Sequence, residues 1–271
     1  MRKLLINSDH DRTLCRDFAT TVAIRFNSSL KPKVALDMLM AEPPAGGKIA
    51  LPEHVVKDYL THTGKRRLET LEDIAICGEW GLYDSGWLTK PQLVSIKASL
   101  LAGLREAELE MAKAEIPKLL TKGAISYAKS ISGAKYVHTI ISEGWEPLVQ
   151  ATANALRDMG ASIAKVVANT PVFENGVFTG RLIKIDKASA SAAAYASLGF
   201  RLDRKGGYKH AVMVDDSAEN IPMMKQHGLA IAFCPTDRDS SAFKGTGIEV
   251  QTVRDLSLTF KRIEEFAANG K

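Results

Sequence analysis

Cysteine is scarce in this sequence of 271 residues. Its three cysteines, Cys15, Cys77 and Cys234, lie far apart and include no Cys-x-x-Cys pair. Disulfide frameworks and structural zinc sites need cysteines in even numbers or at close, regular spacings. We therefore expect neither kind of site, and a reducing cytoplasm is the default location.

Long apolar runs are also missing. No run reaches the roughly 20 residues that cross a bilayer. The apolar stretch after Met1-Arg2-Lys3 is too short for a signal peptide, and Asp9 interrupts it. We expect a cytoplasmic protein that has no membrane segment.

Positive charge is present but dispersed, with a formal net charge of +5. The densest basic stretch, Lys65-Arg66-Arg67, is short and has acidic neighbours at Glu69 and Glu72. Nucleic-acid binding is typically accompanied by a basic stripe with interleaved aromatic residues. The sequence therefore argues against a nucleic-acid partner, whereas a mildly basic protein suits a small anionic substrate.

The hydrophobic pattern divides the chain into three parts. The apolar run Leu4-Leu5-Ile6 predicts a strand that ends in an acidic loop by residue 14. The stretch 15–132 is helical in pattern, with Gly and Pro between the segments. The helices predicted in it are 16–28, 53–62, 68–78, 90–115 and 118–130.

From residue 133 onward, predicted strands alternate with predicted helices. The strands are 136–141, 163–167, 211–214 and 229–233, and the helices are 147–159, 187–198, 218–226 and 256–266. A hairpin is expected at 172–182, because Asn175-Gly176 is a strong turn signal. Alternation of this kind predicts a parallel sheet flanked by helices. We expect a core of residues 1–14 and 133–271, with the helical stretch 15–132 inserted after the first strand.

Two carboxylates follow the first strand in Asp9-His10-Asp11-Arg12-Thr13. In open α/β sheets, ligands bind at the carboxyl ends of the strands. One carboxylate there can attack an electrophile while the other moves protons, with a divalent cation holding both. A solvated turn is the simpler interpretation of this motif alone. A calcium loop is excluded, because Leu14 and Thr20 occupy positions that need Gly and Glu.

Three other polar groups lie where a predicted strand or loop meets a helix. Ser142 precedes Glu143-Gly144, and backbone N–H groups of such a turn can hold phosphate. Lys187 lies at the start of a helix, where a positive charge is unusual. Asp215-Asp216 ends a buried strand, where carboxylates need a partner or a metal ion. Alone, each could be a helix cap or a surface charge, and composition does not favour Lys187 over Lys184.

The order of these groups along the chain resembles the haloacid dehalogenase superfamily of aspartate-nucleophile phosphatases, and more closely its phosphoserine phosphatase-like branch. Residues 167–180 (VANTPVFENGVFTG) are similar to the "AN…xxGxxTG" hairpin of that branch, and residues 142–145 (SEGW) to its "SGGF" turn. Residues 216–224 (DSAENIPMM) resemble "DGANDxxM", and residues 228–234 (GLAIAFC) resemble "GLxIAFCA". The likeness covers residues 3–14 and about 134–268.

The resemblance implies a Rossmann-like α/β core and an inserted α-helical cap of the C1 type. It also implies hydrolysis of a small phosphate ester through an aspartyl-phosphate. Asp9 would be the nucleophile, and Asp11 would protonate the leaving oxygen and activate water. Asp9, the backbone carbonyl of Asp11, and Asp216 would bind Mg²⁺.

The remaining roles also follow from the resemblance. Ser142 and Lys187 would hold the phosphoryl oxygens, together with the turn residues Glu143 and Gly144. Thr13 would support the first loop. The alignment selects Lys187 over Lys184.

Several residues depart from the family pattern. Arg12 replaces a small residue, Asp215 replaces a Gly of the metal motif, and Glu143 replaces a Gly of the serine turn. Glu219-Asn220 replaces Asn-Asp, so that Asp215, Glu219 and Asn220 are candidates for the outer shell of the metal.

The position that reads a substrate amino group in phosphoserine enzymes is usually a Glu, whereas residues 14–24 contain only Asp17 as an acid. The alternatives are a binding or regulatory protein on the same fold and a phosphotransferase. The sequence does not indicate the oligomeric state.

Overall fold

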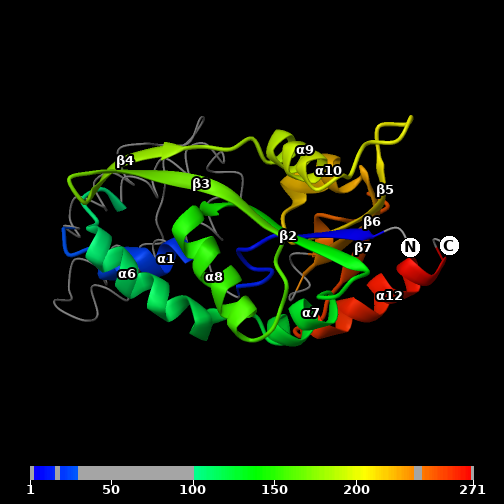
Figure 1. Ribbon diagram of the computed structural model, residues 1–271, viewed down its shortest axis with the longest axis horizontal. Coiled ribbons are helices and arrows are strands. Elements are labelled where there is room, and N and C mark those ends of the chain that lie inside the picture. Colours follow the sequence, from blue (N-terminus) through cyan, green and yellow to red (C-terminus); the bar gives the residue numbers. More distant parts are fainter. Residues whose placement is uncertain (1–2, 16–18, 30–100, 235–239, 270–271) are drawn as a thin grey trace. The chain divides into compact units, whose positions relative to one another are not determined.

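The computed structural model describes residues 3–15, 19–29, 101–234 and 240–269 (Figure 1). The helices predicted at 53–62 and 68–78, and the first part of that at 90–115, lie outside these residues. So do Asp17, Cys77 and Lys65-Arg66-Arg67.

Seven strands form one sheet in the order β4-β3-β2-β1-β5-β6-β7. β1 lies at its centre and pairs in parallel with β2 and β5, and β3, β6 and β7 extend the parallel pairing outward. This confirms the predicted α/β class with a mainly parallel sheet. The strands are β1 (Leu4–Ser8), β2 (Tyr136–Trp145), β3 (Lys165–Glu174), β4 (Val177–Ile183), β5 (Tyr208–Asp215), β6 (His227–Phe233) and β7 (Glu249–Gln251).

Helices complete the described elements. The α-helices are α1 (Ala19–Phe26), α6 (Glu106–Glu115), α7 (Ala124–Ser130), α8 (Glu146–Asp158), α9 (Lys187–Ser197), α10 (Ile221–Met224) and α12 (Thr259–Asn269). Short 3₁₀ turns are η2 (Ile116–Leu119), η3 (Ala218–Asn220) and η4 (Leu256–Leu258). The alanine-rich α9 begins at an N-cap, because the Asp186 carboxylate accepts a hydrogen bond from the Ser189 N–H.

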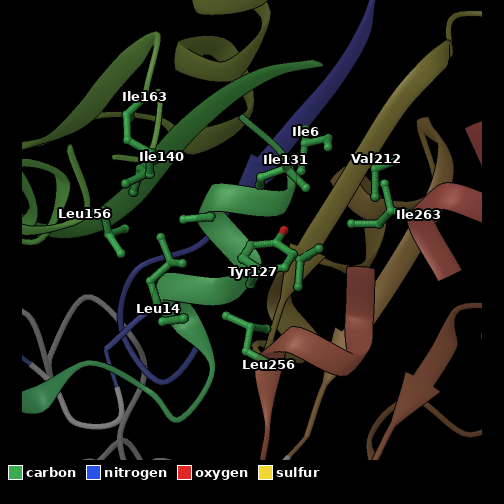
Figure 2. Close-up of a cluster of buried hydrophobic side chains, with 14 of the residues drawn as sticks. Ile6, Leu14, Tyr127, Ile131, Ile140, Leu156, Ile163, Val212, Leu256 and Ile263 are labelled. Carbon is green, nitrogen blue, oxygen red and sulfur yellow. The ribbon is translucent and has the colours of Figure 1, made fainter. Parts of the chain in front are cut away.

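The central strands are buried on both faces because their side chains alternate between two cores. Ile6 of β1 and Val212 of β5 point to the face covered by α7, α8 and α12, where Tyr127 is fully buried (Figure 2). Leu5 points to the other face, which is covered by α9. α10 packs on the same face against Met213. Near-continuous apolar strands are typical of a parallel sheet with helices on both sides.

The chain divides into two compact units. The first comprises residues 1–19, 115–170 and 184–271, and the second comprises 20–114 and 171–183. This division differs from the predicted boundaries at residues 115–132, because Tyr127 and Ile131 of that stretch are buried among the side chains of the sheet. It also differs at the β3–β4 hairpin, because residues 171–183 belong to the second unit and were predicted to belong to the core.

In the second unit, backbone hydrogen bonds join the residues at the start of α6 to the β3–β4 hairpin. Asn175 and Gly176 both have positive φ, as the predicted turn requires. The backbone of Phe178 exchanges hydrogen bonds with Gly103 and Leu104. The Glu108 carboxylate accepts hydrogen bonds from Ser28 and from the backbone N–H of Arg105 at the start of α6.

Two predicted helices are interrupted, and one strand was not predicted. The helix predicted over 90–115 is wrong at Gly103, whose φ of 85° breaks the helical backbone before α6 begins. The helix predicted over 118–130 is likewise broken at Gly123, whose φ is 81°. β7 is short and half-buried at the sheet edge, so it lacks an apolar pattern. Throughout the described residues, every helix is too short or too polar to cross a membrane.

Gly228 is tightly enclosed where the β5–β6 register shifts. A Cβ atom there would lie 2.3 Å from the Lys209 carbonyl oxygen and 2.8 Å from the Phe266 ring. We expect Gly228→Ala to lower the free energy of unfolding by about 1–3 kcal/mol through overpacking. Urea unfolding measures this change. Gly133→Ala, at a position with no atom within 4 Å of the added Cβ, is the matched control, and an equal loss in both variants would contradict the packing argument.

Candidate active site

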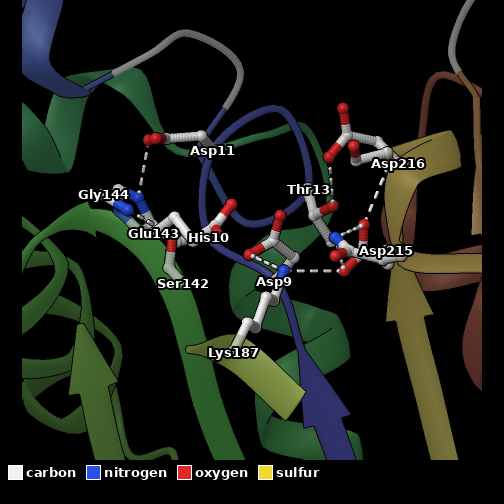
Figure 3. A network of polar contacts seen from close by, with 12 residues as sticks. Asp9, His10, Asp11, Thr13, Ser142, Glu143, Gly144, Lys187, Asp215 and Asp216 are labelled. Carbon is white, nitrogen blue, oxygen red and sulfur yellow. Dashed lines mark hydrogen bonds and ion pairs between the residues drawn. The ribbon is translucent and has the colours of Figure 1, made fainter. Parts of the chain in front are cut away.

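The sheet register brings the predicted polar residues to one edge. Ser8 at the end of β1 pairs with Ile140 of β2 and with Val214 of β5. Asp9 and Asp215 follow at the next level, and Ser142 lies one residue beyond that level. Figure 3 shows them around the loop that leaves β1. All belong to the first unit.

The Lys187 ammonium lies between two carboxylates. Its Nζ is 2.9 Å from Asp9 Oδ1 and 2.8 Å from Asp215 Oδ2, and its side chain is only 6% exposed. Burial alone would lower the pKa of Lys187, but the Asp215 and Asp9 carboxylates raise it above its ordinary value. Lys187 is therefore a fixed positive charge. Lys184, which composition could not distinguish from it, is exposed.

Asp215 is fully buried, and its carboxylate is engaged by neighbouring donors. Asn220 Nδ2 donates to both oxygens at 2.9 Å, and the Ser217 N–H donates to Oδ1 at 2.8 Å. With Lys187 on Oδ2, both oxygens are occupied by the protein. Asn220 thus faces Asp215, whereas Glu219 is exposed.

Asp216 is buried beside the loop after β1. Its Oδ2 is 3.4 Å from Arg12 Nη1, and its Oδ1 accepts a hydrogen bond from the Thr13 hydroxyl at 3.5 Å. Burial raises the pKa of Asp216, an effect that the Arg12 guanidinium opposes and the neighbouring Asp9 and Asp215 reinforce. Arg12 adopts a positive φ of 61°, an unusual backbone conformation for a residue other than glycine.

Asp9 has an unusual balance of charges around it. Burial raises its pKa to about 6, against the opposing effect of the Lys187 ammonium. Its backbone N–H donates to the Val214 carbonyl oxygen, which ties the start of the loop to β5. Asp9 is therefore held at the sheet edge, where burial keeps its pKa above the ordinary value.

The serine turn lies within an irregular part of β2, where the pairing with β3 shifts register between Ile141 and Trp145. Ser142 is buried, and its Oγ accepts a hydrogen bond from the Gly144 N–H at 3.1 Å. The Asn169 amide donates to the Glu143 carbonyl oxygen and accepts from the Ile185 N–H. Asn169 thus connects the serine turn to the segment that precedes Lys187, a role that the sequence motif alone did not indicate.

Asp11 points away from Asp215 and Asp216 and lies near Gly144 (Figure 3). Its Oδ1 is 2.8 Å from His10 Nδ1, and His10 Nε2 is 2.8 Å from the Thr152 hydroxyl in α8. His10 and Thr152 are fully buried. The sequence did not indicate this contact, because the two residues are 142 positions apart and His10 occupies the unspecified position of the Asp-x-Asp motif.

The carboxylates have the chemistry of a divalent-cation site. Ligand oxygens of Asp9, Asp215 and Asp216 all lie within 4.8 Å of one another, and all three residues are buried. Hard cations prefer such oxygen ligands. The hydrogen bonds on both oxygens of Asp215 are 2.8 to 2.9 Å long, whereas the contacts of Asp216 are longer, at 3.4 and 3.5 Å. Asp9 and Asp216 are therefore the better candidate ligands of the three.

Comparison with known proteins supports the resemblance. No family model matches the chain. A phosphoserine phosphatase of Lactococcus lactis subsp. lactis is 27% identical over 158 residues, which span 55% of this chain and 66% of the relative, slightly less than two thirds of its length.

Solved structures agree with this match. A phosphoserine phosphatase with a phospho-aspartyl intermediate analogue has a TM-score of 0.62 at 20% identity, covering 97% of this chain and 99% of that one. A HAD family hydrolase from Salmonella enterica serovar Typhi has a TM-score of 0.62 at 15% identity, covering 96% and 71%. The chain has the haloacid dehalogenase fold. The predicted resemblance to its phosphoserine phosphatase-like branch is confirmed.

The raised pKa of Asp9 predicts a pH-dependent stability difference. Because the folded pKa of about 6 exceeds the unfolded value of 3.8, ionisation of Asp9 weakens the fold as pH rises between them. In EDTA, Asp9→Asn should therefore raise the free energy of unfolding at pH 7.5, by up to about 3 kcal/mol, and by much less at pH 4. Urea unfolding at both pH values measures this.

Asp203→Asn is the control with the opposite sign. Hydrogen bonds from the backbone N–H groups of Gly207 and Lys205 lower the pKa of Asp203, so its carboxylate stabilises the fold at pH 7.5 and the variant should lose stability there. A gain for Asp9→Asn that is the same at pH 4 and pH 7.5 would contradict the account.

Proposed function

We propose that this protein is a divalent-metal-dependent phosphatase that hydrolyses a small phosphate monoester through an aspartyl-phosphate on Asp9. The observation that supports this most strongly is the position of Asp9, with Lys187 at 2.9 Å and Asp216 in the same buried carboxylate group. A carboxylate beside a fixed ammonium and a potential metal site can approach a phosphoryl group without strong charge repulsion.

Asp9 is proposed as the nucleophile. A carboxylate oxygen would form a bond to phosphorus while the bond from phosphorus to the ester oxygen breaks. The leaving oxygen would take a proton from Asp11. Asp11 would then accept a proton from water, whose oxygen attacks phosphorus, releases inorganic phosphate and restores the Asp9 carboxylate.

Lys187 and Ser142 are proposed to bind the phosphoryl oxygens. Lys187 supplies positive charge, which is already held by Asp215 and Asp9. The Ser142 oxygen accepts from the Gly144 N–H, so its own proton is available to donate to a phosphoryl oxygen. Glu143 would contribute through the backbone of the turn.

Mg²⁺ is the cation that we propose, held by Asp9, Asp216 and the backbone carbonyl of Asp11. When bound, it would neutralise negative charge on the phosphoryl group. Arg12 Nη1 lies 3.4 Å from Asp216 Oδ2. Metal binding to this oxygen would weaken the ion pair between Arg12 and Asp216.

The substrate is proposed to be a small phosphorylated metabolite, with phosphoserine as the first candidate because of the Lactococcus relative. The insertion after β1, predicted at 15–132, would act as a cap that excludes water and selects the leaving group. We propose a cytoplasmic enzyme whose partner is this small substrate rather than a nucleic acid or a membrane.

The Arg12–Asp216 ion pair favours one alternative, a binding or regulatory protein on the same fold. A guanidinium group on Asp216 occupies a carboxylate oxygen that the metal would need. In that case the protein would bind phosphate esters without turning them over. A phosphotransferase would instead pass the phosphoryl group to an added alcohol.

Hydrolysis of p-nitrophenyl phosphate tests the proposal. We expect turnover with Mg²⁺, loss of turnover in EDTA, and reduction to background in Asp9→Asn, because the amide is a poor nucleophile. The measurement is the steady-state release of p-nitrophenol, with Asp203→Asn as the matched control that retains activity.

Three outcomes would contradict the proposal. Turnover that survives in Asp9→Asn would exclude Asp9 as the nucleophile. A protein that binds phosphate esters but does not hydrolyse p-nitrophenyl phosphate or phosphoserine with any divalent cation would favour the binding protein. Phosphoryl transfer to added alcohol in preference to water would indicate the phosphotransferase.

A further inference from the structure

His10 separates the two aspartates of the first loop, yet it does not face the solvent or the metal group. Its ring is fully buried and contacts two other polar side chains. Nδ1 is 2.8 Å from Asp11 Oδ1, and Nε2 is 2.8 Å from Thr152 Oγ1. A buried imidazole with both nitrogens engaged has a defined orientation.

The chemistry of the partners assigns the proton. Asp11 Oδ1 is an acceptor both in the ionised carboxylate and when Asp11 carries its proton on Oδ2, so we assign a proton to His10 Nδ1. In the neutral ring, Nε2 then accepts from the Thr152 hydroxyl, which lies on α8 (Glu146–Asp158). Thr152 is therefore an anchor that keeps the Nδ1–H directed at Asp11.

The hydrogen bond also determines where the other Asp11 oxygen lies. With Oδ1 on His10, Oδ2 lies beside the serine turn, where a Cβ atom on Gly144 would be only 3.2 Å from it and 3.3 Å from Ser142 Oγ. The same geometry is visible in Figure 3, where Asp11 is on the Gly144 side of the loop. Asp11 Oδ2 and the proposed phosphate-binding hydroxyl thus border the same small space.

We propose that His10, anchored by Thr152, is a positioning residue that aims the Asp11 carboxyl group at the leaving oxygen of the substrate. This inference rests on the proposed function, in which Asp11 protonates that oxygen. His10 itself does not touch the substrate. Neither the predicted motif nor the resemblance assigns a role to His10 or Thr152.

Leaving-group dependence distinguishes this role from a merely structural one. Phosphate esters of weakly acidic phenols need more help from a general acid than p-nitrophenyl phosphate does. We expect His10→Phe to reduce kcat for phenyl and p-methoxyphenyl phosphate about 10- to 100-fold more than for p-nitrophenyl phosphate. Thr152→Val should likewise lower kcat more for phenyl and p-methoxyphenyl phosphate than for p-nitrophenyl phosphate. Thr152→Ser should restore the wild-type ratio of these kcat values.

Two control variants accompany this series. His10→Asn retains an N–H donor near the position of Nδ1. It should therefore recover part of the kcat for phenyl and p-methoxyphenyl phosphate that His10→Phe loses. His210→Phe makes the same substitution at a partly buried histidine of β5 outside the site and should leave the ratio unchanged. An equal loss on all three esters in His10→Phe would overturn the positioning role while leaving the phosphatase intact. Wild-type protein that hydrolyses none of them would instead overturn the proposed function and this role with it.

A spectroscopic measurement tests the geometry without any substrate. In ¹⁵N NMR of the full chain, the His10 signals, assigned by their loss in His10→Phe, should report a protonated Nδ1. A ring with a proton on Nε2 alone would overturn the hydrogen bond to Asp11. Because this measurement needs no enzymatic activity, it tests the hydrogen bond between His10 and Asp11 independently of the kinetic series.

Discussion

The ammonium group of Lys187 is buried between the carboxylates of Asp9 and Asp215, and the other parts of the site are arranged around it. Removing a charge from water is costly unless partners replace the lost hydration. Here each partner is held in turn, Asp215 by Asn220 and Ser217, and Asp9 by the backbone of β5. The parallel register of β1 and β5 makes this possible, because it puts Asp9 and Asp215 at one level.

This arrangement explains two departures from the family pattern together. The sequence has Asp215 where the pattern has Gly, and Asn220 where it has Asp. In the structure these two side chains contact each other at 2.9 Å, so the negative charge has moved from one position to its neighbour in space. Arg12, a third departure, lies near the remaining carboxylate, Asp216. The first two departures therefore move one negative charge without changing the total, and Arg12 adds one positive charge.

Most of the core could be predicted because its strands are apolar runs and its turns carry strong signals. Val212-Met213-Val214 and Asn175-Gly176 are examples, and the class of the sheet followed from the alternation of strands and helices. The break at Gly103 could not be predicted from amphipathic spacing, since the apolar period continues through it. β7 could not be predicted either, because a short strand at a sheet edge has no pattern of its own.

The candidate site was predictable in its members but not in its contacts. The strand pattern predicted that Asp9, Ser142 and Asp216 share one sheet edge. Composition did not distinguish Lys187 from Lys184, whereas the family resemblance selected Lys187, and the structure shows that Lys187 is buried and Lys184 exposed. Contacts between distant residues, such as His10 with Thr152, leave no signal in one sequence. The phosphatase prediction is supported by the similar phosphoserine phosphatases.

Chemical trapping of the phosphorylated residue tests the central claim most directly. Borohydride reduces an acyl phosphate to an alcohol, so protein quenched during turnover of p-nitrophenyl phosphate with Mg²⁺ should carry homoserine at position 9, detectable by peptide mass spectrometry. Homoserine at Asp9 that depends on substrate is the result expected. Reduction at Asp11, Asp215 or Asp216, or continued turnover with no reduced aspartate, would contradict the account.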